Sequence, residues 1–570
     1  MASIRVEFDV EMPMRDGVML RGDIFRPSVR SKVPAVVCRT PYDKSARKRD
    51  RWFPAVESAR AGFAVVYQDT RGRFTSDGEW HPMDWGGGER FDGYDTVEWL
   101  AAQPWCDGNV GMFGGSYEAG NQIAAAIEHP PHLRAIAPSL GGVGYDGVRR
   151  SSMALETIVL GWTAMMAVDV IGKRAARGED TGDDLAKVMS VMADPAAAAW
   201  TLPLQDLPPL QVAGMPSYEG ITDIIAAGAG AMIGNEDRIE VPVLFTTGWY
   251  DIGVGTWHWR TVRERAATEL ARTESKLIIG PWGHTAHDHN MGEWGFGMFA
   301  ALERSGVVEG HRHFFSRHLR GDDAAPGLAN VRYFVMGANA WKESPTWPPP
   351  GTEIRPSYLH SGGGANTAAG DGTLTWDPPT GEEPADSYDY DPAHPVRSFG
   401  LRVMYNGGST VHGPFDQARI ERRDDVVVYT SAPLEAPMEI AGDVELRVFV
   451  SSSAPDTDFV PKLCDVDAEG ISCNIADGFA RARYRDSWES PTPLEEGKTY
   501  ELTIDLGPVA HRFAAGHCVR LQLTSSCFPH WDRNMNTGNP PGTDAGGVIA
   551  HQTVHHSSHW PSLLLLPVVP

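Results

Sequence analysis

The sequence predicts an α/β protein: a parallel sheet with a helical insertion, followed by a C-terminal domain of antiparallel strands. Three patterns along the 570 residues support this prediction. Short apolar runs with few polar breaks fit strands that are covered on both faces, as in a parallel sheet. A long apolar stretch at residues 153–171 is typical of a packed helix. In the last third of the chain, apolar and polar residues alternate, which indicates strands with one buried face.

The N-terminal part begins with a predicted hairpin. Val6, Phe8 and Val10 share one face of the first strand, and residues 15–17 (Arg-Asp-Gly) supply the turn. The predicted strands of the parallel sheet are residues 34–38, 63–67, 110–113, 133–137, 241–246 and 276–279. A crossover helix is expected over residues 89–103, with acidic residues near its start, where they suit the helix dipole.

The sheet pattern stops near Gly144 and resumes at Val241. Residues 183–192 of the intervening segment place Leu185, Val188 and Met192 on one face of a second helix. We predict that this segment is a cap over a substrate cleft, with an additional packed layer as the alternative. The predicted domains are 1–144 and 241–346 for the two parts of the α/β domain, 145–240 for the cap and 347–570 for the C-terminal domain.

The C-terminal domain follows a proline-rich break at residues 345–350. Three segments, 444–450, 502–506 and 519–523, each place apolar residues at every second position. Residues 563–569 are predicted to form a closing strand. This pattern predicts an antiparallel sandwich or jelly roll.

Charge and composition narrow the range of partners. The formal net charge of −24 repels phosphate backbones and anionic lipid, so neither nucleic acid nor a membrane surface is an expected partner. No apolar stretch reaches the ~20 residues that span a bilayer. The N-terminus lacks the apolar core of a signal peptide, so we expect a cytoplasmic protein. The six cysteines have no CxxC spacing, and those in apolar runs, Cys38 and Cys518, are expected to be buried free thiols. A homodimer is left open.

Residues 110–120 (Val-Gly-Met-Phe-Gly-Gly-Ser-Tyr-Glu-Ala-Gly) carry the first sign of chemistry. A buried-type strand runs into a glycine-rich turn around Ser116, and a helix-like segment follows. A nucleophilic serine is held exposed on a strand–turn–helix elbow of this kind. Glu118 stands where the usual G-x-S-x-G pattern has its second glycine, so the motif by itself leaves an ordinary loop serine as the alternative.

Two further residues complete a catalytic set. A serine hydroxyl needs a base to take its proton, and that base needs an acid to orient it. Asp251 follows the predicted strand at 241–246, and His284 follows the one at 276–279. Both lie just beyond a strand end and follow Ser116 in the order serine, acid, histidine that this arrangement uses. The sequence therefore predicts Ser116 as nucleophile, His284 as base and Asp251 as the orienting acid.

The chain resembles the bacterial cocaine esterase family, which also includes X-prolyl dipeptidyl-peptidases and α-amino acid ester hydrolases. The resemblance rests on the serine elbow and on Thr-Pro-Tyr-Asp-Lys at 40–44, Gln-Asp-Thr-Arg-Gly at 68–72, Gly-Trp-Tyr-Asp at 248–251 and Gly-Pro-Trp-Gly-His at 280–284. It covers nearly the whole chain and is strongest toward the cocaine esterase branch. It implies an α/β-hydrolase domain with an inserted helical cap and a C-terminal jelly roll. Ala119 departs from the glycine that many members have.

The resemblance also implies roles around the nucleophile. The Tyr42 hydroxyl and the backbone N–H of Tyr117 would form the oxyanion hole, and Trp162 would line the acyl pocket. From the sequence alone, Tyr42 also fits an ordinary turn tyrosine after Pro41, and Trp162 fits ordinary cap packing. Arg71 and Asp69 are interpreted as structural partners at a strand end.

The histidines at 284, 287, 289, 311 and 313 have no matching carboxylate or cysteine pattern, so no metal and no cofactor is expected. The predicted substrate is a small ester or amide. Family members that act on α-amino acid esters carry acids just after the triad aspartate, but here Ile-Gly-Val follows at 252–254. We therefore predict hydrolysis of esters with apolar or aromatic acyl groups, with X-prolyl dipeptidyl or amide cleavage as the alternative. An inactive carbohydrate-binding protein is a further, disfavoured reading.

Overall fold

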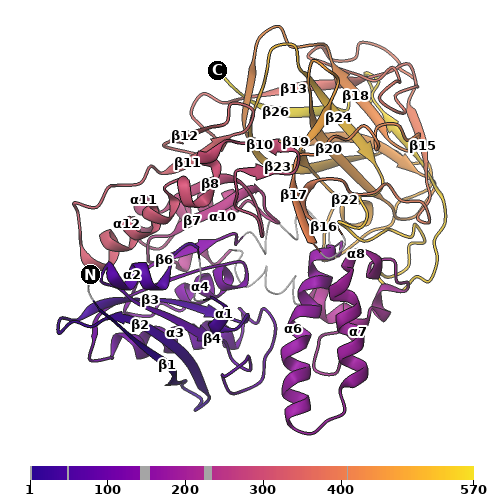
Figure 1. The fold of residues 1–570 in the computed structure, drawn as a ribbon. Helices are drawn as coiled ribbons and strands as arrows, with labels where there is room; N and C mark the ends of the chain where they lie inside the picture. The colour runs from indigo at the N-terminus through magenta and orange to yellow at the C-terminus, as the bar shows by residue number, and fades with distance from the viewer. Residues whose placement is uncertain (1–2, 48–50, 142–153, 224–233, 407–408) are drawn as a thin grey trace.

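A computed structural model describes residues 3–47, 51–141, 154–223, 234–406 and 409–570 (Figure 1). The α/β domain and the β-rich C-terminal domain lie side by side, and two helices, α6 (Thr157–Ala176) and α7 (Gly182–Ala193), project beside them. No helix in these ranges has the length and apolarity that crossing a membrane requires.

The α/β domain is built on a ten-stranded sheet whose middle strands run parallel. In spatial order the strands are β1 (Ile4–Pro13), β2 (Met19–Pro27), β4 (Ala64–Asp69), β3 (Val33–Thr40), β5 (Cys106–Gly115), β6 (Leu133–Ser139), β7 (Leu244–Tyr250), β8 (Lys276–Gly283), β11 (Val331–Val335) and β12 (Ala340–Ser344). The six predicted parallel strands are confirmed, because each lies within or overlaps one of the parallel-paired strands.

Helices cover both faces of this sheet, which explains the nearly continuous apolar runs. Along β3, Val37 packs in the cluster that contains the buried residues of α3 (Gly88–Ala101) and α4 (Tyr117–Ile127). Its neighbour Val36 points to the other face, toward the aromatic residues of α12 (Val307–Arg320). The predicted crossover helix at 89–103 is therefore confirmed as α3 to within two residues.

The N-terminal hairpin forms, but its first strand is not covered. β1 pairs antiparallel with β2, and the register shifts between Glu7 and Val10. This irregularity breaks the simple alternation predicted for Val6, Phe8 and Val10. Because β1 is the edge strand, Phe8 remains 61% exposed.

The helical insertion contains α6 (Thr157–Ala176) and α7 (Gly182–Ala193), which pack on each other. The predicted buried face of α7 is wrong in part. Val188 and Val191 are buried against α6, whereas Leu185 and Met192 are 41% and 37% exposed. The two valines are three residues apart and point directly at the contact, while Leu185 and Met192 lie at the edges of this face.

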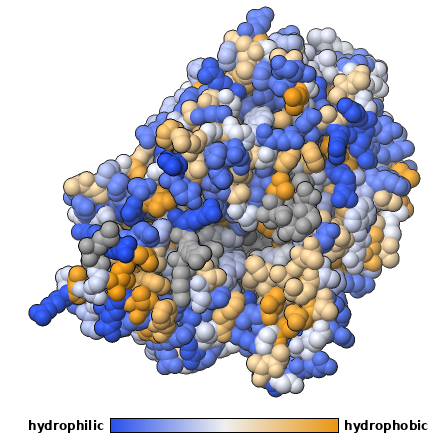
Figure 2. Space-filling view, in the orientation of Figure 1, coloured by the Kyte–Doolittle hydropathy of each residue, from blue (hydrophilic) through white to orange (hydrophobic). Residues whose placement is uncertain are grey.

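Several apolar side chains on these two helices remain at the surface. They are Met165, Val168, Leu185, Met189 and Met192. The view in Figure 2 shows orange residues over this part of the molecule, whereas much of the remaining visible surface is polar.

The C-terminal domain is a twelve-stranded, mostly antiparallel assembly. Its strands are β13 (Glu353–His360), β14 (Thr373–Thr375), β15 (Asp386–Tyr390), β18 (Val427–Ser431), β19 (Met438–Ser452), β20 (Asp458–Val466), β21 (Ser472–Asp477), β22 (Ala480–Arg481), β23 (Tyr500–Phe513), β24 (Cys518–Thr524), β25 (Ala550–His555) and β26 (Leu563–Val569). All three predicted alternating faces are buried, and the closing strand at 563–569 is confirmed. A separate hairpin, β16 (Leu401–Asn406) and β17 (Ser409–Gly413), lies between the two domains.

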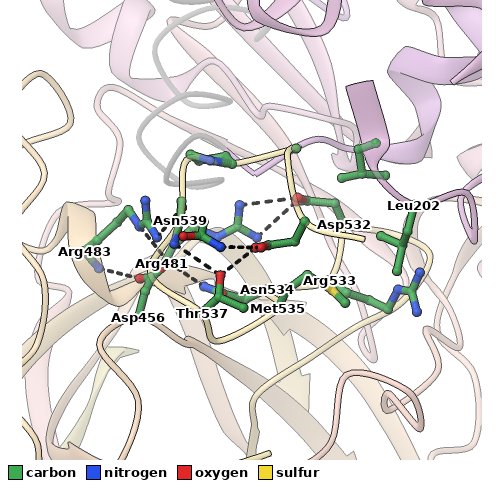
Figure 3. Close-up of a pocket in the computed structure, with 14 residues that line it drawn as sticks. Leu202, Asp456, Arg481, Arg483, Asp532, Arg533, Asn534, Met535, Thr537 and Asn539 are labelled. Atoms are coloured by element: carbon green, nitrogen blue, oxygen red, sulfur yellow. Dashed lines mark hydrogen bonds and ion pairs between the residues drawn. The ribbon is translucent and has the colours of Figure 1, made fainter. Parts of the chain in front are cut away.

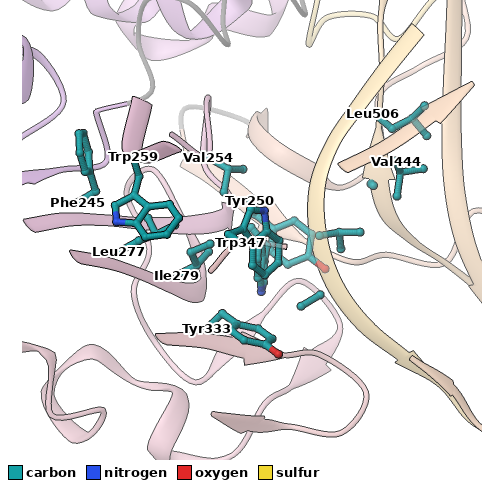
Figure 4. Close-up of a cluster of buried hydrophobic side chains, with 14 of the residues drawn as sticks. Phe245, Tyr250, Val254, Trp259, Leu277, Ile279, Tyr333, Trp347, Val444 and Leu506 are labelled. Carbon is teal, nitrogen blue, oxygen red and sulfur yellow. The ribbon is translucent and has the colours of Figure 1, made fainter. Parts of the chain in front are cut away.

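One hydrophobic cluster continues from the α/β domain into the C-terminal domain (Figure 4). Trp347 follows β12, and its ring lies 5.5 Å from that of Trp249 and 5.3 Å from that of Tyr333. Val444 and Leu506 belong to the same cluster from the side of the C-terminal domain. The cysteines in the described residues are free, and Cys38 is buried as predicted. The predicted burial of Cys518 is wrong, because this residue begins β24 and is partly exposed.

Candidate active site

Ser116 occupies a sharp turn between β5 and α4. Its backbone has φ 62° and ψ −123°, a conformation that L residues rarely adopt. The Ser116 N–H donates to the Ser139 carbonyl at 2.9 Å, and the Ser116 carbonyl accepts from the Ala119 N–H at 2.9 Å. Gly114 leaves room for this turn, because a Cβ there would lie 2.7 Å from that of Glu118. The predicted strand–turn–helix elbow is therefore present.

Glu118 explains why the usual second glycine is not needed. The side chain is completely buried, and its carboxylate accepts the Gly115 N–H at 3.0 Å. The Gln122 amide donates to the carbonyls of both Gly114 and Glu118 at 3.1 Å. These bonds satisfy backbone groups that the turn would otherwise leave buried without partners. No local sequence pattern indicates this role.

Ala119 also fits without distortion. Its methyl group lies where a Cβ on Gly141 would come within 2.6 Å. Because Gly141 has no side chain, the extra methyl of Ala119 is accommodated.

The structure brings Ser116, His284 and Asp251 together. The Nε2 atom of His284 lies 2.9 Å from the Ser116 Oγ, and its Nδ1 atom lies 2.7 Å from an Asp251 oxygen. Ser116 and His284 directly follow β5 and β8, and Asp251 directly follows β7. Since these strands run parallel, their carboxyl ends meet at one edge of the sheet.

The Asp251 carboxylate is wholly buried and held by other groups as well. It accepts the Ile252 N–H at 2.8 Å and the Thr247 hydroxyl at 3.2 Å. These bonds fix the carboxylate, which in turn fixes the orientation of the imidazole ring of His284. The chain Asp251–His284–Ser116 has the geometry for moving a proton off a serine hydroxyl.

Three aromatic residues contact one another beside the nucleophile, since one of them, Tyr117, directly follows Ser116. Tyr42 lies between β3 and α1 (Lys44–Arg47), and its ring contacts that of Tyr117 edge-on at 6.3 Å. Trp162 of α6 stacks on Tyr117 at 6.4 Å, and its indole N–H donates to the Tyr42 hydroxyl at 3.1 Å. The structure thus brings together the three aromatic residues that the sequence singled out.

The side chain of Tyr117 is fully engaged elsewhere. Its hydroxyl donates to buried Glu89 at 3.1 Å and accepts the Met83 N–H at 3.0 Å. Burial raises the pKa of this hydroxyl well above its ordinary value. The backbone N–H of Tyr117, in contrast, belongs to the first turn of α4, where N–H groups lack acceptors within the helix.

Two histidines flank His284: His412 is buried, and His287 is partly buried. Burial, together with nearby positive groups, lowers the pKa of His287 to about 3 and that of His412 to about 3. His287 packs edge-on against the rings of Trp52 and Trp282. Across the described residues, no group of three or more His, Cys, Asp or Glu side chains is arranged to hold a metal ion.

Asp69 and Arg71 have structural roles, as predicted. Buried Asp69 accepts the Lys44 N–H at 2.7 Å and the Thr75 hydroxyl at 2.9 Å. Arg71 forms a two-bonded ion pair with Asp92.

A polar pocket lies where the helical insertion meets the C-terminal domain (Figure 3). Arg481 is buried there, forming a two-bonded pair with Asp458 and an ion pair with Asp532. Asp532 also accepts the Leu155 N–H at 2.9 Å, which ties the start of the insertion to this network. No local sequence pattern predicts this anchor, because its members are far apart along the chain.

Models of known protein families match the α/β domain and the C-terminal domain of this chain, in that order. Residues 16–286 match the family model for X-Pro dipeptidyl-peptidase (S15 family), and residues 325–565 match that for the X-Pro dipeptidyl-peptidase C-terminal non-catalytic domain. A cocaine esterase from Rhodococcus sp. (strain MB1 Bresler) is 37% identical over 99% of this chain and 98% of its own length.

Two solved structures share the whole fold. An aminopeptidase from the marine sediment archaeon Thaumarchaeota archaeon has a TM-score of 0.76 at 23% identity. An α-amino acid ester hydrolase has a TM-score of 0.75 at 24% identity. Each alignment covers 100% of this chain and 97% of the other.

Proposed function

The chain belongs to the family of serine hydrolases that includes cocaine esterase and the X-Pro dipeptidyl-peptidases, and from this premise we propose that it cleaves carboxylic esters through an acyl-enzyme on Ser116. The observation that carries the proposal is the continuous hydrogen-bonded chain from Asp251 through His284 to Ser116.

The reaction proceeds in two acyl transfers. His284 removes the hydroxyl proton as Ser116 attacks the ester carbonyl, and then gives that proton to the departing alcohol. Asp251 holds the imidazole in the required tautomer and stabilises its charged form. Water, deprotonated by His284, then attacks the acyl-enzyme and releases the acid.

The oxyanion is bound by the Tyr42 hydroxyl and the Tyr117 N–H. The indole N–H of Trp162 supports this role for Tyr42, because it occupies an acceptor position on the hydroxyl oxygen. A phenol that accepts one hydrogen bond can still donate its own proton elsewhere. Such donors stabilise the developing negative charge more than the neutral carbonyl.

The helical insertion acts as a cap, and the C-terminal domain has the jelly-roll arrangement. Trp162 reaches from α6 to Tyr42, and buried Arg73 donates to the Met166 carbonyl of the same helix at 3.0 Å. Asp169 of α6 accepts the Phe74 N–H. These contacts hold α6 against loops at the catalytic edge of the sheet, which supports a cap more than a remote extra layer.

The preferred acyl group is neutral and apolar or aromatic. Tyr42, Tyr117 and Trp162 are aromatic, and Trp80 packs on Trp162 with ring centroids 6.1 Å apart. No acid follows Asp251 in Ile252-Gly253-Val254 to hold a substrate ammonium group. The alternative, X-prolyl dipeptidyl or amide cleavage, is supported by the S15 family match. The shared fold does not choose between them, because it occurs in both an aminopeptidase and an ester hydrolase.

The test compares p-nitrophenyl esters of several acyl groups with Ala-Pro and Gly-Pro anilides. We expect higher kcat/KM for the esters, and stoichiometric labelling by an organofluorophosphate that is lost in Ser116→Ala. A clear preference for the anilides would replace esterase with peptidase. If the wild type neither hydrolyses these substrates nor reacts with the organofluorophosphate, the result would instead favour a carbohydrate-binding protein. Glycan binding would then be measured.

A further inference from the structure

The β16–β17 hairpin belongs to the C-terminal part of the chain but lies beside the catalytic edge of the α/β domain (Figure 1). Its residues fall within the match to a domain described as non-catalytic. Two of its buried side chains, Arg402 and His412, nevertheless contact the backbone or side chains next to Asp251 and His284.

Arg402 connects the hairpin to the aspartate loop. Its guanidinium donates to the Ile252 carbonyl at 2.9 Å and to buried Asp477 at 3.1 Å. Ile252 is the residue whose N–H binds the Asp251 carboxylate at 2.8 Å. The peptide unit before Ile252 is therefore hydrogen-bonded to the Asp251 carboxylate, and the peptide unit after it is hydrogen-bonded to Arg402 of the C-terminal domain. Because Asp477 is 1% exposed, the guanidinium is held by a partner that is itself rigidly packed.

His412 connects the hairpin to the histidine loop. Its Nε2 atom lies 2.8 Å from the Thr285 hydroxyl, one residue after His284. Its ring also lies against Gly283, one residue before His284, where an added Cβ would come within 2.3 Å of the His412 Nδ1. The imidazole thus touches the chain on both sides of the proposed base.

The chain beyond the histidine loop is held by the same hairpin. The Glu293 N–H donates to the Pro414 carbonyl at 2.8 Å, and the Glu293 carboxylate accepts the Asp416 N–H at 2.9 Å. Gly413 allows this approach, since a Cβ on it would lie 2.6 Å from the Met291 carbonyl carbon. The contacts therefore extend from Gly283 to Glu293 along the segment that carries His284.

We propose that the β16–β17 hairpin positions the loops of Asp251 and His284, so that Arg402 and His412 are positioning residues for ester hydrolysis. The inference rests on the proposed roles of Asp251 and His284. Neither side chain touches the reacting atoms. They set the distance and angle between acid and base from a different domain, so the C-terminal domain takes part in catalysis without supplying a catalytic residue. An interface that only joined the two domains would not need to contact Ile252, Gly283 and Thr285, which directly adjoin Asp251 and His284.

The first test uses Arg402→Gln, with Arg402→Lys as the conservative variant. A misplacement of about 1 Å lowers turnover by about 10- to 100-fold, so we expect that loss in kcat for Arg402→Gln, with KM within about twofold of the wild type. Lysine can still donate to the Ile252 carbonyl and should recover part of the loss. The matched control is Arg520→Gln, which breaks a comparable ion pair to Glu421 in the same domain, away from the triad loops.

A second variant guards against misfolding, because replacing Arg402 breaks its ion pair with the buried carboxylate of Asp477. Thr285 is exposed, so Thr285→Val should fold normally while losing the hydroxyl that His412 contacts. We expect a lower kcat and slower organofluorophosphate labelling than in Thr499→Val. That control removes a similar hydroxyl–imidazole contact, to His555 at 3.4 Å, elsewhere in the C-terminal domain.

The outcomes separate the two proposals. If Ser116→Ala abolishes turnover but both Arg402→Gln and Thr285→Val keep the kcat of their controls, the hairpin has no positioning role and the esterase assignment stands. A loss of thermal stability at unchanged kcat would likewise overturn the positioning role. If the wild type itself neither labels nor hydrolyses esters, the proposed function fails first.

Discussion

At the scale of single residues, the backbone of Ser116 has a conformation that L residues rarely adopt. A non-glycine residue in such a conformation costs roughly 1–3 kcal/mol and persists only where the surroundings hold it. Here the holding groups are the Ser139 carbonyl, the buried Glu118 carboxylate and the start of α4. The strain places the hydroxyl clear of its own backbone and in reach of His284.

Tyr42 offers a direct test of the oxyanion hole. Tyr42→Phe keeps the ring contact with Tyr117 but removes the hydroxyl donor. Loss of one such donor costs about 100- to 1,000-fold in kcat, and we expect this loss with little change in KM in steady-state ester hydrolysis. Tyr358→Phe in β13 is the control and should match the wild type. Unchanged turnover in Tyr42→Phe would show that the hydroxyl does not bind the oxyanion.

Only part of the candidate site could be predicted from the sequence. Ser116, Asp251 and His284 could be predicted because each directly follows an apolar strand, in the required order. Arg402 and His412 could not, because their contacts to the triad loops span 150 and 127 residues. The role of Glu118 was equally hidden: only the folded turn shows which N–H its carboxylate accepts.

At the scale of elements, the contact between α6 and α7 buries one valine of these helices and leaves another exposed. Val188 is completely buried in this contact, while Val168 of α6 is 38% exposed. Val188→Thr should lower the free energy of unfolding by about 1–2 kcal/mol, because a hydroxyl enters an apolar contact. Val168→Thr, the same change at the surface, should stay within about 0.5 kcal/mol. Urea unfolding of both variants makes the comparison, and equal effects would place Val188 outside the contact.

The apolar patterns predicted the buried strands more accurately than the helical periodicity predicted the buried face of α7. The buried strands of both domains were readable because they are covered continuously on two faces or alternately on one. On α7, by contrast, apolar residues occupy a wider arc than the contact with α6 covers. The sequence therefore could not tell buried Val191 from exposed Leu185.

At the scale of the whole molecule, a buried histidine should make the free energy of unfolding depend on pH. His311 is fully buried, and burial lowers its pKa to about 4. In the unfolded chain a histidine binds a proton near pH 6.5. As the pH falls below that value, the unfolded state gains a proton that the folded state does not, so the free energy of unfolding decreases until the pH reaches about 4.

Urea unfolding should reveal this contribution. Between about pH 6 and pH 5, His311 should account for a loss of about 1 kcal/mol in the free energy of unfolding. His311→Gln should lose correspondingly less over the same interval, whatever its stability at neutral pH. Identical losses in the variant and the wild type would mean that His311 takes up its proton as readily in the folded protein as in the unfolded chain.

The position of β26 has a consequence for how the protein is made. This strand follows β13 and β19 in the sequence by more than 100 residues, yet it lies between them in the interior of the C-terminal sheet. During synthesis on the ribosome, these two neighbours emerge long before the strand that joins them. We therefore expect β13 and β19 to remain unjoined in the nascent polypeptide until β26 has been synthesised and can pair with both of them.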